Sequence, residues 1–395
     1  MSQLDELIRE LCPDGVPFRK IKDVYQRLRG TPITAAKMKE IADDNGEVRV
    51  FAGGKTVINT QEENIPNANI TRIPAVLVQS RGVIDVVYYD KPFTFKNEMW
   101  AYTTNEQASV KFLYYVLKSN IQQFRDAASG MGSLPQISLP VTEEFSIPVP
   151  PIEIQREIVR ILDKFTELSA ELSAELSARQ RQYSYYREKL LTAHTDAPLL
   201  PLCNVTTMIR NGFVYKPDKD RSKRYKISRI ETISNGKINM DKVGSSDNVN
   251  ESYRLQDGDI LFSHINSLTW LGNTAFYSAD LGELYHGMNL LCFRAEQKKI
   301  NPRYLYHIMN SQYFRRLIER YAKHSCNQYS LAIGDIQKWT IPVPSLDMQQ
   351  HIVNVLDKFD TICSDLQNGL PAEIEARRKQ YEYYRDKLLT FKPLA

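Results

Sequence analysis

The residues of this chain with the clearest catalytic potential are a glycine-lysine loop and its scattered histidines and cysteines. Gly53-Gly54-Lys55-Thr56 resembles the end of a phosphate-binding loop, but the first glycine that such a loop requires would fall at Arg49. The six histidines form no metal-ligand spacing and no recognisable Ser/His/Asp order, and the five cysteines form no CxxC pair. We therefore predict no catalytic residues and no metal site.

A second motif, Asn301-Pro302-Arg303-Tyr304, resembles the Asn-Pro-Pro-Tyr of adenine methyltransferases. Arg303 interrupts that motif and no glycine-rich cofactor loop precedes it, whereas Asn followed by Pro is typical of the start of a helix. Pro217-Asp218 likewise lacks the spaced acidic residue and lysine of a nuclease site. We expect a chain that binds rather than cuts or methylates.

Other polar residues suit DNA recognition, which uses donors and acceptors at base edges together with basic groups on phosphates. The candidates lie in polar or glycine-containing loops, where a solvent-exposed or structural role is an equally open alternative for each. They are Arg29, Thr31, Lys37, Lys55, Arg81, Lys96, Asn97 and Gln136 in the first half of the chain, and Arg210, Asn211, Lys216, Lys223, Arg224, His264, Asn266, Asn327 and Gln328 in the second. Gln136 and Gln328 occupy matching positions of an internal repeat, which favours both.

The internal repeat is the strongest pattern in the sequence. Residues 147–165 match residues 341–359 at 11 of 19 positions, and residues 179–192 match residues 377–390 at 10 of 14. A single duplication with a period of about 195 residues is the size of a whole domain plus a connector. The chain is therefore expected to use one unit, a domain followed by a helix, twice.

Each copy of the repeat ends in an amphipathic stretch. Apolar residues recur at spacings of four and three from Ile158 to Leu190, through Leu168, and again from Ile352 to Leu388, through Ile362. Arg179 and Arg377 each fill one step, and the pattern is the seam of a coiled coil. A helix of forty-odd residues would be about 60 Å long. The second copy has four extra residues, and we expect a kink or break at 368–371 because Pro371 has no backbone N–H.

Short β-type runs such as Pro74–Val78 and Asp259–Phe262, with one helix in each half at Ser109–Arg125 and Pro302–Tyr321, predict mixed domains. The predicted fold class is α+β, with two similar mixed α/β domains joined by two long antiparallel coiled-coil helices in a pseudo-twofold repeat. The expected boundaries are residues 1–151 for the first domain with its N-terminal helix, 152–195 for the first long helix, 196–344 for the second domain and 345–395 for the second long helix.

The composition, with 42% hydrophobic and 25% charged residues, is ordinary for a globular protein. No apolar run approaches the ~20 residues that span a bilayer, so we expect a cytoplasmic protein. The net charge of +4 is uneven, because residues 196–344 contain 20 Lys and Arg against 14 Asp and Glu. The second domain is thus the basic one, and the near-neutral first domain suggests that the chain alone binds DNA weakly.

Four motifs of this chain resemble the specificity subunits of type I restriction-modification systems. They are the opening Leu4–Val16, the Ile-Pro-x-Pro motifs at Ile147 and Ile341, the Tyr-x-Tyr-Tyr-Arg endings at Tyr183 and Tyr381, and Gly258–Phe262. The resemblance covers essentially the whole chain. It implies that the two domains are target-recognition domains, that each reads one half of a split, asymmetric target in double-stranded DNA, and that the helices set the gap.

The resemblance also implies partners. Two modification (methyltransferase) subunits, docked on the helices, would carry S-adenosylmethionine and methylate an adenine in each half-site, and restriction subunits would translocate and cleave DNA with ATP and Mg. The chain itself would be non-catalytic and would bind no cofactor. The alternatives are a coiled-coil adaptor whose domains bind proteins and a self-sufficient methyltransferase, which the missing motifs disfavour.

Overall fold

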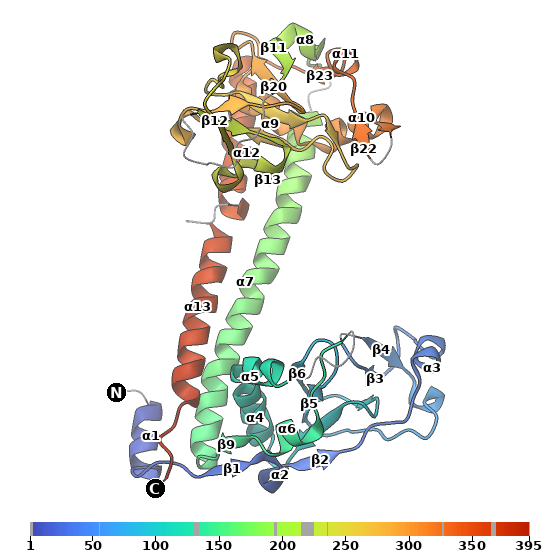
Figure 1. Ribbon diagram of the computed structural model, residues 1–395, viewed down its shortest axis with the longest axis vertical. Coiled ribbons are helices and arrows are strands. Elements are labelled where there is room, and N and C mark those ends of the chain that lie inside the picture. The colour runs from blue at the N-terminus through green and yellow to red at the C-terminus, as the bar shows by residue number, and fades with distance from the viewer. Residues whose placement is uncertain are drawn as a thin grey trace. The chain divides into compact units, whose positions relative to one another are not determined.

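The computed structural model describes residues 3–54, 56–128, 134–192, 196–214, 225–234, 236–325, 328–364 and 369–394. The chain divides into two compact units, which we describe separately (Figure 1). Unit 1 comprises Met1–Leu172 with Ile374–Ala395, and unit 2 comprises Ser173–Glu373. The expected four-part division follows chain order, whereas each compact unit joins a domain to the helix segments that pack on it.

Unit 1 is built on two sheets. The first has the order β2-β8-β5-β6 with all neighbours antiparallel, and the second has the order β4-β3-β7 with β3 and β7 parallel. The strands are β2 (Gln26–Leu28), β3 (Val48–Phe51), β4 (Val57–Thr60), β5 (Ala75–Gln79), β6 (Asp85–Tyr89), β7 (Phe93–Phe95) and β8 (Trp100–Thr103). Strand β5 is central and buried throughout, because its alternate side chains enter different cores: Val76 and Val78 pack below α4, and Ala75 and Leu77 pack against the second sheet.

Unit 2 repeats this plan. Its main sheet has the order β11-β20-β16-β18, and its second sheet has the order β15-β12-β19 with β12 and β19 parallel. The strands are β11 (Thr206–Asn211), β12 (Tyr225–Ser228), β15 (Gly244–Ser246), β16 (Ile260–Ser263), β18 (Thr274–Phe276), β19 (Tyr285–His286) and β20 (Leu290–Ala295). Strand β16 alternates as β5 does, with Ile260 and Phe262 in one core and Leu261 in the other.

Smaller elements complete the two domains. Unit 1 also contains α1 (Gln3–Leu11), β1 (Phe18–Lys20), α2 (Ile21–Val24), α3 (Ala35–Glu40), η1 (Glu62–Asn64), α6 (Leu139–Glu143) and β9 (Ser146–Pro148). Unit 2 also contains β10 (Leu199–Pro201), α8 (Leu202–Val205), η2 (Ile230–Thr232), β13 (Ile233–Ser234), β14 (Lys237–Ile238), η3 (Met240–Lys242), η4 (Glu251–Tyr253), β17 (Ile265–Asn266), η5 (Ala279–Leu281), β21 (Lys323–Ser325), β22 (Gln328–Ser330), α11 (Ile333–Ile336) and β23 (Thr340–Pro342). The pairs β1-β9 and β10-β23 bring the start of each domain to the Ile-Pro strand that precedes its long helix.

The single helix predicted in each domain is in fact two consecutive helices. Unit 1 has α4 (Gln107–Ser119) and α5 (Ile121–Asp126), and unit 2 has α9 (Pro302–Met309) and α10 (Gln312–Tyr321). The break lies at an asparagine in both domains: the side chains of Asn120 and Asn310 each donate to the carbonyl four residues earlier, at 2.8 Å, and so end the first helix. Periodicity alone does not reveal such a break.

The long helices are α7 (Ile152–Thr192), α12 (Leu346–Ser364) and α13 (Leu370–Leu389). Residues 365–368, which include the start of the expected interruption, lie outside the described residues. Pro371 is the second residue of α13, where its missing N–H removes no helical hydrogen bond. The proline therefore helps to begin a new helix.

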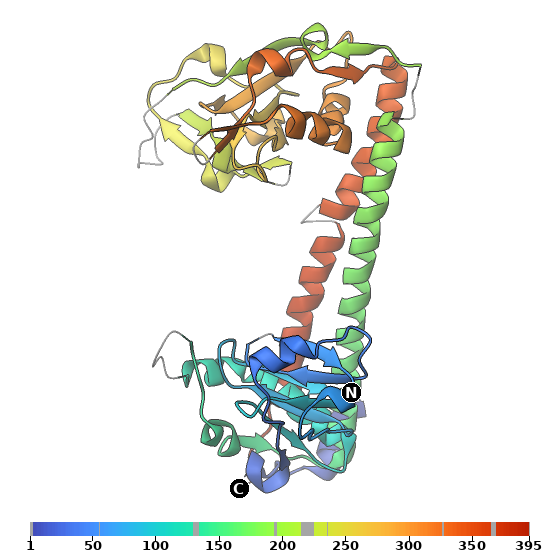
Figure 2. The ribbon, with the colours of Figure 1, turned by 90° about the vertical axis from the view of Figure 1, so that its right-hand side faces the viewer.

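In each unit, α7 runs antiparallel to the C-terminal helix beside it (Figure 2). In unit 1 the ring of Phe165 lies 6.4 Å from Tyr381 and 5.6 Å from Tyr384, and in unit 2 Phe359 lies 6.2 Å from Tyr183 and 5.8 Å from Tyr186.

Two predicted seam residues, one in each copy of the repeat, are wrong. Leu168 is 38% exposed and Ile362 is 42% exposed, whereas the residues that follow them, Ser169 and Cys363, are half-buried and buried. After Phe165 the half-buried positions are Ser169 and then Leu172, at steps of four and three, so the seam passes one residue beyond Leu168.

Candidate nucleic-acid interface

Five polar segments of unit 1 meet at one set of loops. This unit 1 loop cluster comprises residues 29–31, 53–54, 80–82, 96–98 and 134–137. Backbone hydrogen bonds join its parts: Thr31 N–H to Phe95 O at 2.7 Å, Gly54 N–H to Arg81 O at 3.0 Å, and Ile137 N–H to Ser80 O at 2.9 Å.

The structure brings together most of the candidates of unit 1. Arg29, Arg81, Asn97 and Gln136 are exposed on this cluster, and Arg81 and Gln136 are backbone partners in a β-bridge. Lys96 is half-buried and forms an ion pair with Glu98 at 3.0 Å.

Two candidates of unit 1 do not join this surface. Thr31 is fully buried, and its hydroxyl pairs with that of Thr94 at 2.7 Å and accepts from the Asn69 N–H, so it is not among the surface donors of the cluster. Lys37 lies on α3 in an ion pair with Glu40 at 2.7 Å. Lys55 lies outside the described residues.

A hollow of about 370 Å³ opens within the unit 1 loop cluster. Arg27, Arg29 and Asn97 line it together with the edge of Trp100. Guanidinium and amide groups beside an aromatic ring can donate to base edges and phosphates and can stack. The hollow therefore offers hydrogen-bond donors of the kinds that bind nucleic acids, although Arg27 also pairs with Glu143 at 3.2 Å.

Unit 2 has a corresponding loop cluster, made of residues 211–214, 264–267, 287–289 and 328–331. Met288 N–H donates to Phe213 O at 3.0 Å, and Leu331 N–H donates to His264 O at 2.9 Å. At Gly212 a Cβ atom would lie 2.0 Å from the Gly287 carbonyl oxygen, and at Gly30 of unit 1 it would lie 2.1 Å from that of Phe95. Both clusters thus depend on a glycine that lets two backbones approach closely.

The candidates of unit 2 occupy different environments. Asn211 and Asn266 are half-buried and Gln328 is exposed on the cluster, while Arg210 lies beside it with its guanidinium 4.0 Å from the ring centroid of Tyr253. His264 is 5% exposed and burial lowers the pKa of its imidazole, so it is not among the surface groups of the cluster. Lys216, Lys223, Arg224 and Asn327 lie outside the described residues.

Sequence reasoning missed a polar hollow beside this cluster in unit 2. A hollow of about 540 Å³ is lined by Phe213, Ser246, Asn248, Asn250 and Tyr253 among others. The run Asp247-Asn248-Val249-Asn250 could have indicated it, since asparagines in a loop are typical base readers as well as typical turn residues.

The backbone hydrogen bonds show that Gln136 and Gln328 do not occupy equivalent positions of the two domains. Ile137 and Leu331 donate to equivalent carbonyls, and Arg81 pairs with Gln136 as Ile265 pairs with Ser330. The true counterpart of Gln136 is therefore Ser330, two residues beyond Gln328. Sequence similarity was too weak here to fix the register.

The corrected register shows that the two clusters share a backbone and differ in side chains. Arg81 is replaced by Ile265 and Lys96 by Gly287, since Lys96 and Gly287 donate to equivalent carbonyls of β3 and β12. One scaffold therefore presents two different chemical surfaces.

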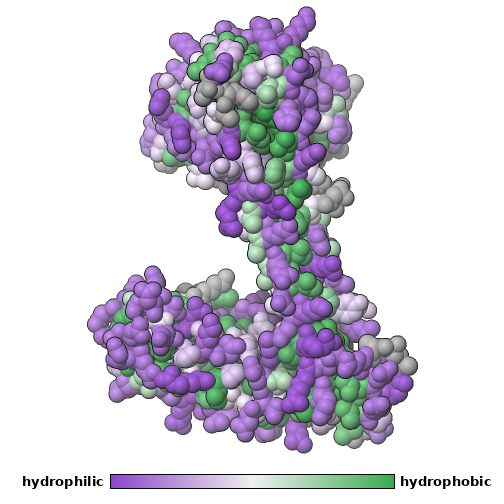
Figure 3. Space-filling model, turned by 180° about the vertical axis from the view of Figure 1, so that it is seen from behind, coloured by the Kyte–Doolittle hydropathy of each residue, from purple (hydrophilic) through white to green (hydrophobic). Residues whose placement is uncertain are grey.

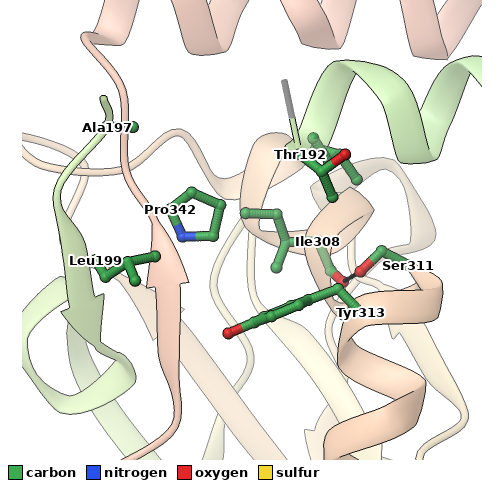
Figure 4. Close-up of a pocket in the computed structure, with 8 residues that line it drawn as sticks. Thr192, Ala197, Leu199, Ile308, Ser311, Tyr313 and Pro342 are labelled. Carbon is green, nitrogen blue, oxygen red and sulfur yellow. Dashed lines mark hydrogen bonds between the residues drawn. The ribbon is translucent and has the colours of Figure 1, made fainter. Parts of the chain in front are cut away.

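A more apolar hollow of about 340 Å³ lies elsewhere in unit 2 (Figure 4). Leu191, Leu199, Ile308 and Pro342 line it with few polar groups. This lining offers no set of donors for base edges, so we do not count the hollow as part of the interface.

The structure shows the environment of the two motifs that resemble a methyltransferase motif and a phosphate-binding loop. Asn301 caps α9, because its side chain accepts from the N–H groups of Arg303 at 2.8 Å and Tyr304 at 3.3 Å, which confirms the helix-start interpretation. After Gly53-Gly54 the next described element is strand β4 rather than the helix that a phosphate-binding loop needs. Across the described ranges, no group of three His, Cys, Asp or Glu side chains could hold a metal ion, and no helix there is long and apolar enough to cross a membrane.

Comparisons with known proteins agree with this architecture. Residues 13–179 and 202–376 each match the family model of the type I restriction modification DNA specificity domain. The chain is 28% identical over 408 residues to the EcoR124I/EcoR124II specificity subunit of Escherichia coli, covering 99% of this chain and 97% of that one. It is also 36% identical over 199 residues to a putative MjaX specificity subunit of Methanocaldococcus jannaschii, a match that covers 49% of this chain and 46% of the relative.

The fold is also that of a solved structure. The crystal structure of a type I restriction-modification S subunit from M. genitalium superposes with a TM-score of 0.59 at 17% identity, covering 95% of this chain and 96% of that one. Both domains of the chain match one family model, and each presents a polar loop cluster on the same scaffold. The chain therefore belongs to the DNA specificity subunits of type I restriction-modification systems, the non-catalytic components that recognise the DNA target.

Proposed function

We propose that each domain reads one half of a bipartite, asymmetric DNA target through its loop cluster, and that the long helices set the gap between the halves. The observation that carries this proposal is the pair of equivalent loop clusters whose side chains differ. Two identical readers would favour a symmetric target, whereas two different readers on one scaffold favour an asymmetric one.

In unit 1 the proposed readers are the exposed Arg29, Arg81, Asn97 and Gln136. Arginine can bond both acceptors of a guanine edge, and asparagine or glutamine can bond an adenine edge in two places. Lys96 is held by Glu98, so we assign it to phosphate or to loop structure rather than to a base.

In unit 2 the proposed readers are Asn211 and Gln328, with Asn248 and Asn250 in the adjoining hollow. Arg210 lies over Tyr253 and donates to the Ser252 carbonyl oxygen, which orients its side chain before binding and so lowers the entropic cost of binding. The basic composition of residues 196–344 supports a larger share of phosphate contacts for this domain.

The helices are the proposed dock for two modification subunits, which would bring S-adenosylmethionine and the methylation chemistry, and restriction subunits would join with ATP and Mg. Tyr185 and Tyr383 occupy equivalent positions of the repeat, and they are 62% and 63% exposed. Hydrophobic residues are visible among hydrophilic ones along the helices in Figure 3. Exposed tyrosines with an apolar body and a polar tip suit a protein interface.

The test is methylation of DNA by the purified chain with its modification subunits, with the modified sites mapped along a genome. A two-part target with a fixed gap is the expected result, and a single contiguous target would refute the proposal. Insertion of one further Leu-Ser-Ala-Glu after Glu175 of α7 adds about 6 Å of helix. We expect the gap to lengthen by about one or two base pairs, at 3.4 Å each, with both specified halves unchanged.

A further inference from the structure

A half-buried aspartate joins the recognition domain of unit 1 to its long helix. Asp163 of α7 receives an ion pair from Lys111 of α4 at 2.7 Å and a hydrogen bond from the Tyr115 hydroxyl at 2.5 Å. Tyr115 is 2% exposed, and burial raises the pKa of its phenol far above the usual range, so the hydroxyl stays a donor. We call these three residues the unit 1 clamp.

Unit 2 has the same arrangement with different residues. Asp357 of α12 accepts from Arg303 Nη2 at 2.7 Å and from His307 Nε2 at 2.8 Å, and both donors lie on α9. Burial lowers the pKa of His307, whose side chain has no exposed surface, so the neutral ring donates through Nε2–H. Burial alone would raise the pKa of Asp357, but the bonds from His307 and Arg303 outweigh it and lower it. These residues form the unit 2 clamp.

Each clamp also reaches the edge of the main sheet. The Lys111 ammonium lies 5.3 Å from the ring centroid of Tyr88 on β6, and the Arg303 guanidinium lies 4.8 Å from that of Phe276 on β18. One cation thus touches a strand of the reading domain and an aspartate of the long helix in each unit. A cation held between a ring and a carboxylate has little freedom to move.

The two clamps are related by the internal repeat. Asp163 and Asp357 share the Leu-Asp-Lys-Phe of the long helices, 194 residues apart (357 − 163), and the donors on α4 and α9 are each 192 residues apart (303 − 111 and 307 − 115). Of the three clamp residues, the aspartate is the same in both units, while lysine is exchanged for arginine and tyrosine for histidine. The geometry is kept although the donor chemistry differs, which indicates that the link itself matters.

We propose that the two clamps are positioning devices, which hold each recognition domain in one orientation on its long helix and so make the subunit discriminate between gaps that differ by one base pair. This inference rests on the proposed function of the helices as spacers. A hydrophobic contact between domain and helix is non-directional, whereas hydrogen bonds to both oxygens of Asp163, and two directed donors on Asp357, constrain rotation. The clamp residues touch no base in this proposal and act through the loops that they orient.

The experiment compares methylation rates on duplexes that carry the mapped target with its native gap and with gaps one base pair shorter and longer. The whole complex of this chain with its modification subunits is used. For the wild type we expect strong preference for the native gap, and for Asp357→Ala and Asp163→Ala we expect that preference to fall on the order of tenfold, the effect of losing charge-assisted hydrogen bonds, while the two specified halves stay the same. Asp347→Ala, which removes an exposed carboxylate from the same helix α12, is the matched control and should keep the wild-type preference.

A more conservative substitution controls for misfolding of the aspartate variants. Tyr115→Phe keeps the ring and removes the hydroxyl that bonds Asp163, so it should fold and still relax the gap preference severalfold. If the variants assemble with their partners and keep the wild-type preference, the clamp inference is overturned and the proposed function stands. If the wild type itself shows no preferred gap, the proposed function of the helices fails instead.

Discussion

Gln349 donates its side-chain amide to the carbonyl oxygen of Pro344 at 2.8 Å, five residues earlier in the chain. The same side chain donates to the Lys299 carbonyl oxygen at 3.2 Å and accepts from the Asn301 N–H at 2.7 Å. It therefore ties the Ile-Pro-Val-Pro strand, the start of α12 and the cap of α9 to one another. This explains why a glutamine follows the Ile-Pro-x-Pro motif.

The corresponding Gln155 in unit 1 has fewer partners, and this difference is testable. Gln155 donates to the Pro150 carbonyl oxygen at 2.7 Å, but its own buried Oε1 has no hydrogen-bond partner. We expect Gln349→Leu to lower the free energy of unfolding by about 2–3 kcal/mol and Gln155→Leu by about 1 kcal/mol, because the first removes three hydrogen bonds to backbone groups and the second removes one. Denaturant unfolding of both variants measures this, and equal losses would contradict the explanation.

Acid should weaken unit 2 selectively. All six histidines lie between residues 194 and 351, in unit 2, and burial lowers the pKa of His286 to about 4. His286 binds a proton near pH 6.5 in the unfolded chain but stays neutral in the folded chain until about pH 4. The free energy of unfolding is therefore at its full value above pH 6.5 and decreases as the pH falls toward 4. The loss from His286 is about 3 kcal/mol, and buried His264 and His307 add to it in the same direction.

Hydrogen exchange at pH 7.5, 6 and 5 can follow each unit by its own peptides. We expect protection of peptides from β11, β16 and β20 to fall with pH, while peptides from β5 and β8, in the unit without histidine, keep theirs. Parallel loss in both units over this range would contradict the prediction.

Gly212 should not tolerate a side chain. Because a Cβ atom there would lie 2.0 Å from the Gly287 carbonyl oxygen, Gly212→Ala must push apart the two strands that carry the unit 2 loop cluster. We expect a loss of about 2–3 kcal/mol in thermal unfolding of unit 2, together with loss of methylation at one half-site. Gly334→Ala is the control, since nothing lies within 4 Å of its Cβ position, and it should be neutral.

Arg81 offers a direct test of the unit 1 surface. Its side chain is exposed beside Gln136, and we expect Arg81→Ala to weaken DNA binding by the assembled complex. Loss of a base contact would cost about 1–3 kcal/mol of binding free energy and relax the specificity at one position of the target. Loss of a phosphate contact would reduce the slope of log K against log salt concentration by about one. Arg72→Ala, which removes an exposed arginine paired with Glu62, is the control and should bind as the wild type does. Unchanged binding by Arg81→Ala would remove this residue from the interface.

Much of the architecture was predictable from local pattern. Strands β5 and β16 overlap the expected β-type runs, and the cap at Asn301 follows from residue types that act on their nearest neighbours. The helix pair predicted from spacing is present, but the seam at Leu168 and the breaks at Asn120 and Asn310 were missed. A hydrophobic period averages over several turns and does not detect a single side chain that ends one.

The candidate site was harder to predict than the fold, because it consists of residues that lie far apart in the sequence. Donors such as Arg81 and Gln136 were selected by residue type, yet the same types include Thr31 and His264, which the fold buries. The match of Gln136 with Ser330 rather than Gln328 became visible when backbone hydrogen bonds fixed the register.

The sequence by itself determined the duplication, the helices and the family, since each rests on patterns within tens of residues or on similarity along the whole chain. The tertiary structure alone decided which polar side chains reach the surface, which loops meet, and that Asp163 and Asp357 each bind two donors from another helix. These properties depend on distances between residues that are tens of positions apart, and such distances are set by the packing of the folded chain.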